Sequence, residues 1–188
     1  MIRRAIVTDI PDINRLLYQV NQIHADGRPD LFVGGLKKYT DKELAGIIPD
    51  DSRPVFVNTD SAGHVLGYAF CVLQDHRQDS FMAPVLTLYI DDICVDASAR
   101  GQHVGKALYD YVTAYAREIG CYNVTLNVWE CNPGARKFYE AMGMVPQKTG
   151  MEKILLPAAG TDPCLSMPGR SAVPGRRAGK VQSKRQFR

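Results

Sequence analysis

The sequence predicts one α/β (α+β) domain with a mixed sheet, followed by a short tail. Segments rich in branched apolar residues alternate along the chain with segments whose apolar residues recur at helical spacing. The 188 residues are 45% hydrophobic and 23% charged, a composition that supplies the core of a single globular domain. We expect the domain over residues 1–156 and the tail over residues 157–188.

In the first half of the domain, short strands enclose two helices. Asp9 precedes a series of apolar residues at helical spacing, and Pro11 falls near the first turn of that helix. Thr40 or Asp41 stands before the second helical pattern as its cap. In chain order we expect a strand at 2–7, a helix after Asp9, a loop at 27–35, a helix at 41–48, and strands at 55–58 and 64–73.

The second half continues the alternation with longer elements. A run rich in branched residues ends at Asp96, and a strong helical pattern follows it and ends at Gly120. A further strand and a helix come next, and Gly143 ends that helix. In chain order we expect a strand at 85–95, a helix at 104–119, a strand at 122–129, a helix at 132–142, and short final strands at 145–148 and 151–155.

The composition argues against several classes of protein. No apolar run approaches the ~18–20 residues that span a bilayer, and the N-terminus carries no apolar signal core, so we expect no membrane contact and a cytoplasmic location. The five cysteines form no C-x-x-C pair, and no histidine stands at metal-ligand spacing. The sequence therefore predicts neither a disulfide scaffold nor a metal site.

The tail differs from the domain in its charge. From Ala158 onward the net charge is +6, against −3 for the rest of the chain. The tail is rich in Pro, Gly, Ser and Arg without a hydrophobic period, so we expect it to be disordered. A basic segment of this kind is consistent with nucleic-acid binding. We favour a solvated appendage with no dedicated role, because composition is a weak signal.

The most informative segment joins the long strand to the strong helix that follows it. The first N–H groups of a helix lack partners and the helix dipole is positive there, so such a turn favours a phosphate. Its glycines allow a ligand to approach closely, and Arg100 and Lys106 add positive charge. A nucleoside-triphosphate loop is excluded, because only three residues separate Gly101 from Gly105 and Ala107 stands where that loop has a hydroxyl. The dinucleotide fingerprint is absent as well.

This turn resembles the acetyl-CoA-binding turn of the GNAT superfamily of N-acetyltransferases, whose pattern is Q/R-x-x-G-x-G/A. Arg100, Val104 and Gly105 match, and His103 takes the place of the first glycine. A second family motif, N-x-x-A-x-x-F/L-Y-x-x-x-G-F, follows on the next strand and helix. Its matching residues are Asn132, Ala135, Phe138, Tyr139 and Gly143, with Met144 for the last Phe. The resemblance covers the whole domain and implies a mixed, mostly antiparallel sheet whose fourth and fifth strands splay apart.

The resemblance implies acetyl-CoA as the co-substrate. In the family, the amides of the turn hold the CoA pyrophosphate, and a bulge in the preceding strand aims the amides of residues 93–95 at the pantetheine arm and the acetyl carbonyl. Asn132 would bond the pantetheine arm, although a helix N-cap is an equally natural role for it. The cofactor-binding residues expected in this way are Ile93, Cys94, Val95, Arg100, Gly101, Gln102, His103, Val104, Gly105, Lys106 and Asn132.

Three residues are expected to be catalytic. Tyr139 matches the family tyrosine that gives a proton to the departing thiolate, with a packing role as the alternative. Asp91 and Asp92 form an acidic pair in an otherwise apolar strand, where burying charge is costly. The segment is similar to spermidine/spermine acetyltransferases, in which the first acid helps to deprotonate the amine through water. Asp91 is therefore the first candidate for the base and Asp92 the second, with a structural salt bridge as the alternative. Side chains alternate along a strand, so we expect the two acids to face opposite sides of the sheet.

The predicted function is transfer of the acetyl group of acetyl-CoA to a primary amine by direct attack in a ternary complex. One alternative is a non-catalytic, CoA-binding regulatory protein of the GNAT fold, which His103 would favour. Another is acetylation of a peptide or protein N-terminus or a lysine. The acceptor is expected near the loop after the first helix, where His24, Asp26 and Asp30 either meet a cationic amine or are simply solvated. Exposed edge strands would allow a homodimer.

Overall fold

A computed structural model describes residues 1–81 and 83–155 of the chain. Contacts divide the chain into one unit over Met1–Met151 and a second over Glu152–Arg188, of which only residues 152–155 are described. The predictions about the basic tail, its disorder and its contact with nucleic acid, lie outside the described residues. Among the residues described, none of the helices has the length and apolar character that a membrane crossing requires.

Five strands of the described chain form one sheet in sequence order. They are β1 (Ile2–Arg4), β2 (Val55–Thr59), β3 (Val65–Asp75), β4 (Leu86–Val95) and β5 (Asn123–Leu126). The first four pair antiparallel with their neighbours, and β5 pairs parallel with β4. The predicted α/β (α+β) class with a mixed, mostly antiparallel sheet is confirmed.

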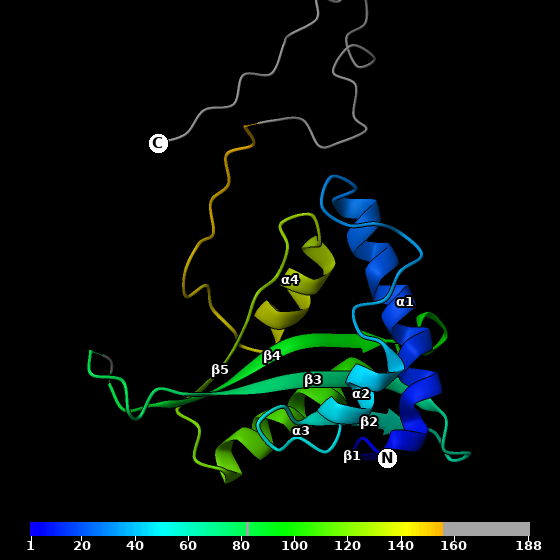
Figure 1. Ribbon diagram of the computed structural model, residues 1–188, viewed down its shortest axis with the longest axis horizontal. Coiled ribbons are helices and arrows are strands. Elements are labelled where there is room, and N and C mark those ends of the chain that lie inside the picture. The colour runs from blue at the N-terminus through cyan, green and yellow to red at the C-terminus, as the bar shows by residue number, and fades with distance from the viewer. Residues whose placement is uncertain (82, 156–188) are drawn as a thin grey trace, which may run out of the picture. The chain divides into compact units, whose positions relative to one another are not determined.

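Helices cover both faces of this sheet (Figure 1). They are α1 (Ile10–Gly27), α2 (Asp41–Ile47), α3 (Val104–Glu118) and α4 (Pro133–Ala141). Leu16 of α1 and Leu44 of α2 belong to the core on one face. Leu108 of α3 belongs to the core on the other, against which Phe138 of α4 packs. Of the two predicted caps, Thr40 begins α2, since its hydroxyl accepts a hydrogen bond from the Glu43 amide.

β4 and β5 separate after a short stretch of pairing. Their paired residues run from Thr87 and Asn123 to Ile90 and Leu126, and none is paired beyond that point. β4 continues to Val95 alongside β3 alone. One edge of residues 91–95 therefore has no strand partner in the part of the chain described, and its backbone groups need other partners. This is the splay between the fourth and fifth strands that the family resemblance implied.

A bulge interrupts β4 where this separation begins. Phe70 of β3 lies opposite Asp92, and the next residue, Cys71, lies opposite Ile90. Asp91 is therefore an extra residue on β4, which locally breaks the alternation of side chains and bends the strand. The bulge was expected in this strand from the family resemblance.

Gly67 on β3 allows the end of β4 and the start of α3 to lie close against the sheet. A β-carbon on Gly67 would stand 2.8 Å from the carbonyl oxygen of Cys94 and 3.1 Å from the side chains of Val104 and Leu108. Real β-carbons do not approach backbone this closely, so only glycine fits. Gly67 thus fixes the position of the turn that joins β4 to α3.

Two predicted strands do not form. Residues 145–148 and 151–155 are not strands, and Val145 and Met151 are 81% and 95% exposed. An alternating pattern makes a strand only where a neighbour supplies ladder hydrogen bonds, and Pro146 has no N–H to donate. Two other strands are shorter than predicted, because residues 7–9 form a 3-10 turn and β5 ends at Leu126.

Candidate active site

A cavity of about 500 Å³ lies between the end of β4, the start of α3 and α4. Phe138 and Met142 of α4 and Ala99 form one part of its wall. The other lining residues all belong to the predicted cofactor set: Val95, Arg100, Gly101, His103, Val104, Gly105 and Lys106. Two cationic side chains and the first residues of α3 therefore border a hollow wide enough for a ligand, as an anion site at a helix N-terminus requires.

The turn before α3 is built on two residues with left-handed backbone. Gly101 has φ of +79° and His103, the N-cap of α3, has φ of +61°. Glycine adopts this conformation freely, whereas a residue with a β-carbon is strained there by about 1–2 kcal/mol. His103 therefore takes both the position of the family glycine and the backbone conformation that glycine favours.

We expect the His103→Gly variant to be more stable than the wild type by about 0.5–1 kcal/mol, because removing the β-carbon relieves more strain than the flexibility of the unfolded chain costs. Urea denaturation measures this difference. The matched control is Gly101→Ala, whose β-carbon would meet nothing within 4 Å, so that only its φ of +79° opposes it. That variant should lose stability. A His103→Gly variant no more stable than the wild type would show that the histidine side chain makes compensating contacts.

The remaining predicted cofactor residues lie outside the lining of this cavity. Asn132 caps α4, since its Oδ1 accepts from the amide of Ala135 at 3.1 Å, which confirms the capping role and leaves the pantetheine contact a prediction. The Gln102 side chain donates to the carbonyl oxygen of Ser98. Cys94 is buried on the α1 face, and burial raises the pKa of its thiol to about 12, as an inert thiol requires. Ile93 and Cys94 remain candidates through their backbone amides alone.

Tyr139 lies on α4 between two residues that line the cavity. Its ring packs against Phe138 at 5.1 Å and against Tyr109 of α3 at 6.4 Å between centroids. Burial, followed by the negative charge of Asp92, raises the pKa of Tyr139 well above its usual value. Its hydroxyl has no hydrogen-bond partner among the described residues. In the described part of the chain, every fully buried side-chain polar atom has a hydrogen-bond partner. The raised pKa keeps the hydroxyl protonated at neutral pH, and because it is unpaired it is not completely buried.

Asp92 is half-buried beside the point where β4 leaves β5. The hydroxyl of Tyr68, which is fully buried, donates to Asp92 Oδ2 at 2.7 Å. Burial raises the pKa of Asp92 to about 6, and the charge of Asp91 adds to this, while Tyr68 and the charge of Lys38 act in the opposite direction. A carboxylate with this pKa is ionised at neutral pH and accepts a proton more readily than an ordinary aspartate.

Asp91 belongs to a small network that crosses from β4 to the segment before α2. Its Oδ2 accepts from Lys38 Nζ at 2.7 Å and from the Tyr39 hydroxyl at 3.0 Å. Burial opposes the charged form of Lys38, but the bond and charge of Asp91 outweigh it and raise the pKa of Lys38. The salt bridge that the sequence analysis left open for this acidic pair is therefore present at Asp91.

The two acids do not face opposite sides of the sheet, and that prediction is wrong. Asp91 bonds Tyr39 and Asp92 bonds Tyr68, and the rings of both tyrosines pack against Phe70 in the core below α1 and α2. The prediction assumed regular alternation, which the bulge at Asp91 removes. Both carboxylates therefore lie on the same face of the sheet. The hydrogen-bond partners of each carboxylate determine how readily it accepts a proton.

The expected acceptor residues are engaged with neighbouring side chains and not with one another. Asp30 accepts two hydrogen bonds from Arg28, at 2.8 and 2.7 Å, and exposed Asp26 accepts one from Gln22. The structure therefore does not bring these acids together as a site for a cationic amine. His24 packs against Phe32, with ring centroids 5.1 Å apart.

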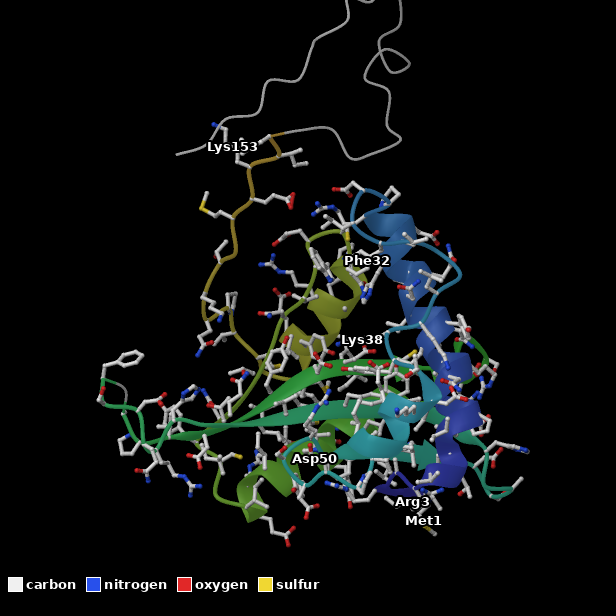
Figure 2. The ribbon with its side chains drawn as sticks, viewed as in Figure 1. Met1, Arg3, Phe32, Lys38, Asp50 and Lys153 are labelled. Atoms are coloured by element: carbon white, nitrogen blue, oxygen red, sulfur yellow. The ribbon has the colours of Figure 1, made fainter. Side chains whose placement is uncertain are left out.

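Sequence reasoning missed four residues near the candidate site, Phe32, Lys38, Tyr68 and Trp129. Figure 2 shows Lys38 above β4 and Phe32 between α1 and α4. The ring of Phe32 meets that of Trp129 edge-on at 5.5 Å. No local pattern signals these partners, because each contact joins segments far apart in the sequence. In the described residues, no cluster of three or more His, Cys, Asp or Glu side chains is arranged to hold a metal ion.

Comparison with known families gives the same result as the fold and the turn. The model of the acetyltransferase (GNAT) family matches residues 18–144. The chain belongs to the GNAT acetyltransferase family. The match contains the β4 bulge, the His103 turn and Tyr139.

Two plant relatives of this GNAT chain match it over a limited region. It is 32% identical over 65 residues to glucosamine 6-phosphate N-acetyltransferase from Arabidopsis thaliana, which is 35% of this chain and 42% of that protein. It is 35% identical over 63 residues to glucosamine 6-phosphate N-acetyltransferase 1 from Oryza sativa subsp. japonica, which is 34% of this chain and 36% of that protein. The matches span less than half the length of these relatives.

Solved structures share the fold over the whole domain. A mutant of the BH1408 protein from Bacillus halodurans has a TM-score of 0.79 and 28% sequence identity, covering 83% of this chain and 99% of that one. The glucosamine-6-phosphate N-acetyltransferase of Arabidopsis thaliana has a TM-score of 0.61 at 22% identity, covering 82% and 97%. At such identities the second structure supports the GNAT fold alone.

Proposed function

We propose that this GNAT chain is an acetyl-CoA-dependent N-acetyltransferase, which transfers the acetyl group directly to a primary amine within a ternary complex. One observation carries the proposal. Near the separation of β4 and β5 lie a half-buried, protonated tyrosine, Tyr139 of α4, and a carboxylate of raised pKa, Asp92 of β4. An acid and a base are thus available beside a cavity at a helix N-terminus.

The chain's own groups fit CoA. The turn at the start of α3 offers backbone N–H groups and the positive end of the helix dipole, and Arg100 and Lys106 add positive charge, so this turn would hold the pyrophosphate. The edge of residues 91–95 that faces away from β3 has no strand partner among the described residues and would pair with the amides of the pantetheine arm. Bound acetyl-CoA supplies a thioester, whose carbonyl carbon is the target of the amine and whose sulfur leaves as a thiolate.

Side chains of this protein would then carry out two proton transfers, one from the amine nitrogen and one to the departing sulfur. An alkylammonium with a pKa of ~10.4 first loses one proton to solvent, which gives the neutral amine that attacks. Asp92, directly or through one water, accepts the second proton, which the nitrogen releases as the N–C bond forms. Tyr139 donates its proton to the sulfur as the C–S bond breaks. Asp91 is the weaker candidate for the base, because Lys38 and Tyr39 already occupy its carboxylate. This reverses the order that the sequence suggested.

The test is release of free thiol from acetyl-CoA with a panel of acceptors. The panel contains polyamines, amino acids, peptides with free N-termini or lysines, aminoglycosides and, because of the plant relatives, glucosamine 6-phosphate. Release with one class supports the proposal and identifies the acceptor. Binding of acetyl-CoA is measured separately by calorimetry. Binding without release from any acceptor would instead support the regulatory alternative, whose basis in the sequence is His103.

A further inference from the structure

Two loops that are distant in the sequence meet beside the acidic pair on β4. The loop after α1 brings Phe32 edge-on to Trp129, which follows β5, and Arg28 stands over the Trp129 ring at 5.8 Å. A β-carbon on Gly27 would stand 2.7 Å from the Sγ atom of Cys131, so the backbones also lie close together there. These loops, residues 28–40 and 127–132, together with His24 and Asp26 at the end of α1, are called the wall here, and the catalytic proposal leaves them without a role. Figure 2 shows Phe32 and Lys38 of the wall over β4.

Among the side chains on this wall with N–H groups that can donate to a ligand are Lys38, which is cationic, and His24, which is neutral. Lys38 is 48% exposed, and its ammonium has three N–H donors, of which one bonds Asp91 at 2.7 Å. His24 packs on Phe32, and burial, with the charge of Lys38, lowers the pKa of its imidazole, so that it is neutral at pH 7 and has one N–H. The wall thus offers N–H donors beside a fixed positive charge.

The acids on the wall or next to it are already paired or solvated, and among them Glu130 bonds Arg136 at 3.0 Å and is largely exposed. Asp91 accepts from Lys38 and Tyr39, and Asp30 is held by Arg28 through both carboxylate oxygens. Asp26 is exposed, where water and salt screen its charge. Asp92 faces the reacting nitrogen as the proposed base, so a second ammonium on the acceptor would lie near Lys38 without a further unpaired carboxylate among these groups. Like charges at short range are unfavourable.

We propose that the acceptor is a primary amine that also carries an anionic group, a phosphate or a carboxylate, and that Lys38 binds this group. The inference rests on the proposed N-acetyltransferase function and adds the class of its substrate. Asp91 holds Lys38 in place before the acceptor arrives, so little side-chain entropy is lost on binding. Polyamines are excluded as good acceptors by the same arrangement.

The first test compares four small acceptors of similar length in the thiol-release assay: O-phosphoethanolamine, β-alanine, ethanolamine and 1,3-diaminopropane. A charge-assisted hydrogen bond from Lys38 should give one of the two anionic amines a kcat/KM about ten-fold or more above that of ethanolamine. The diamine should be no better than ethanolamine. Which of the phosphate and the carboxylate is preferred identifies the anion. A kcat/KM for ethanolamine or 1,3-diaminopropane equal to or above both anionic values would overturn the proposal.

The second test uses Lys38→Gln, which removes the charge but keeps a donor for Asp91. We expect this variant to raise KM for the preferred anionic acceptor about ten-fold and to change that for ethanolamine by less than about three-fold. Lys42→Gln is the matched control, because Lys42 is an exposed lysine on α2 and should leave both values unchanged. Equal losses for anionic and neutral acceptors in Lys38→Gln would assign Lys38 a merely structural role and refute the proposal.

A binding measurement separates this proposal from the catalytic one. Trp129 is the only tryptophan of the chain, and it lies on the wall, so its fluorescence reports binding there without turnover. Titration with O-phosphoethanolamine and β-alanine in the presence of CoA should change the emission saturably in the wild type and much less in Lys38→Gln. Lys38-dependent binding without any acetyl transfer would support the anionic ligand and refute the catalysis. Acetylation of amines without Lys38-dependent binding of the anionic amines would support the catalysis and refute the anionic ligand.

Discussion

We expect the Tyr139→Phe variant to turn over about 100- to 1,000-fold more slowly than the wild type while its affinity for acetyl-CoA changes little. The change removes only the hydroxyl that would protonate the departing sulfur. That hydroxyl has no hydrogen-bond partner among the described residues, so its loss leaves no group unsatisfied and should not lower the melting temperature. Steady-state kinetics with the acceptor found in the panel, together with calorimetric titration of acetyl-CoA, measure both effects.

Tyr109→Phe serves as the control for this result. Tyr109 packs on the Tyr139 ring, and the variant loses the same hydroxyl one side chain away, without a part in the proton transfer. Its kcat should stay within about three-fold of the wild type. If Tyr139→Phe also keeps its kcat within that range, Tyr139 is a packing residue, and another group or water protonates the thiolate.

The second large effect is expected for Asp92→Asn, which should lower kcat/KM about 100-fold or more at pH 7.5. An amide cannot accept the proton of the attacking amine, although it still accepts the hydrogen bond from Tyr68. Asp91→Asn is the matched variant, since it makes the same change at the neighbouring position. A larger loss in Asp91→Asn than in Asp92→Asn would return the role of base to Asp91.

The pH dependence gives this assignment a distinct signature. Burial raises the pKa of Asp92 to about 6, so below this pH the group is protonated and cannot act as a base. An alkylamine acceptor with a pKa of ~10.4 contributes one unit of slope to log kcat/KM over the same range. The wild type should therefore show a slope of two below about pH 6 and of one above it, whereas Asp92→Asn should keep a slope of one throughout. A wild-type profile without a break near pH 6 would argue against Asp92.

The same pKa predicts that Asp92→Asn is more stable than the wild type. A folded-state pKa above the unfolded value of 3.8 means that the folded protein binds more protons between about pH 4 and 6, so stability falls as pH rises through this window. Above it the wild type retains a cost of about 1–3 kcal/mol for the buried charge, which the amide avoids. Urea unfolding at pH 7.5 and pH 4 measures this: the gain should be present at pH 7.5 and shrink toward pH 4. Lower activity with higher stability excludes unfolding as the cause of the loss.

The features around the turn before α3 could be predicted from the local sequence. Local spacing within a few residues predicts the positions of Arg100 and Gly105 in the turn and the order of strand and helix around it. The same kind of local signal predicts the helix cap at Asn132. The core helices could be predicted in the same way, because apolar residues at helical spacing, such as those of α3, indicate which face of the helix is buried. The failed strands at 145–148 and 151–155 have the right local pattern, but the described chain gives them no partner.

The surroundings of the acidic pair on β4 were decided by tertiary structure. The bulge at Asp91 depends on the register of β4 against β3, and it alone determines that both acids face the same side. Lys38 reaches Asp91 from 53 positions earlier in the chain, and Phe32 meets Trp129 from the far end of the domain. Such contacts arise from packing between distant segments, which no local pattern records. The sequence by itself therefore determined the fold, the family and the glycine turn before α3. The tertiary structure determined on which face the two acids lie, and that Asp91 pairs with Lys38 and Tyr39 while Asp92 pairs with Tyr68.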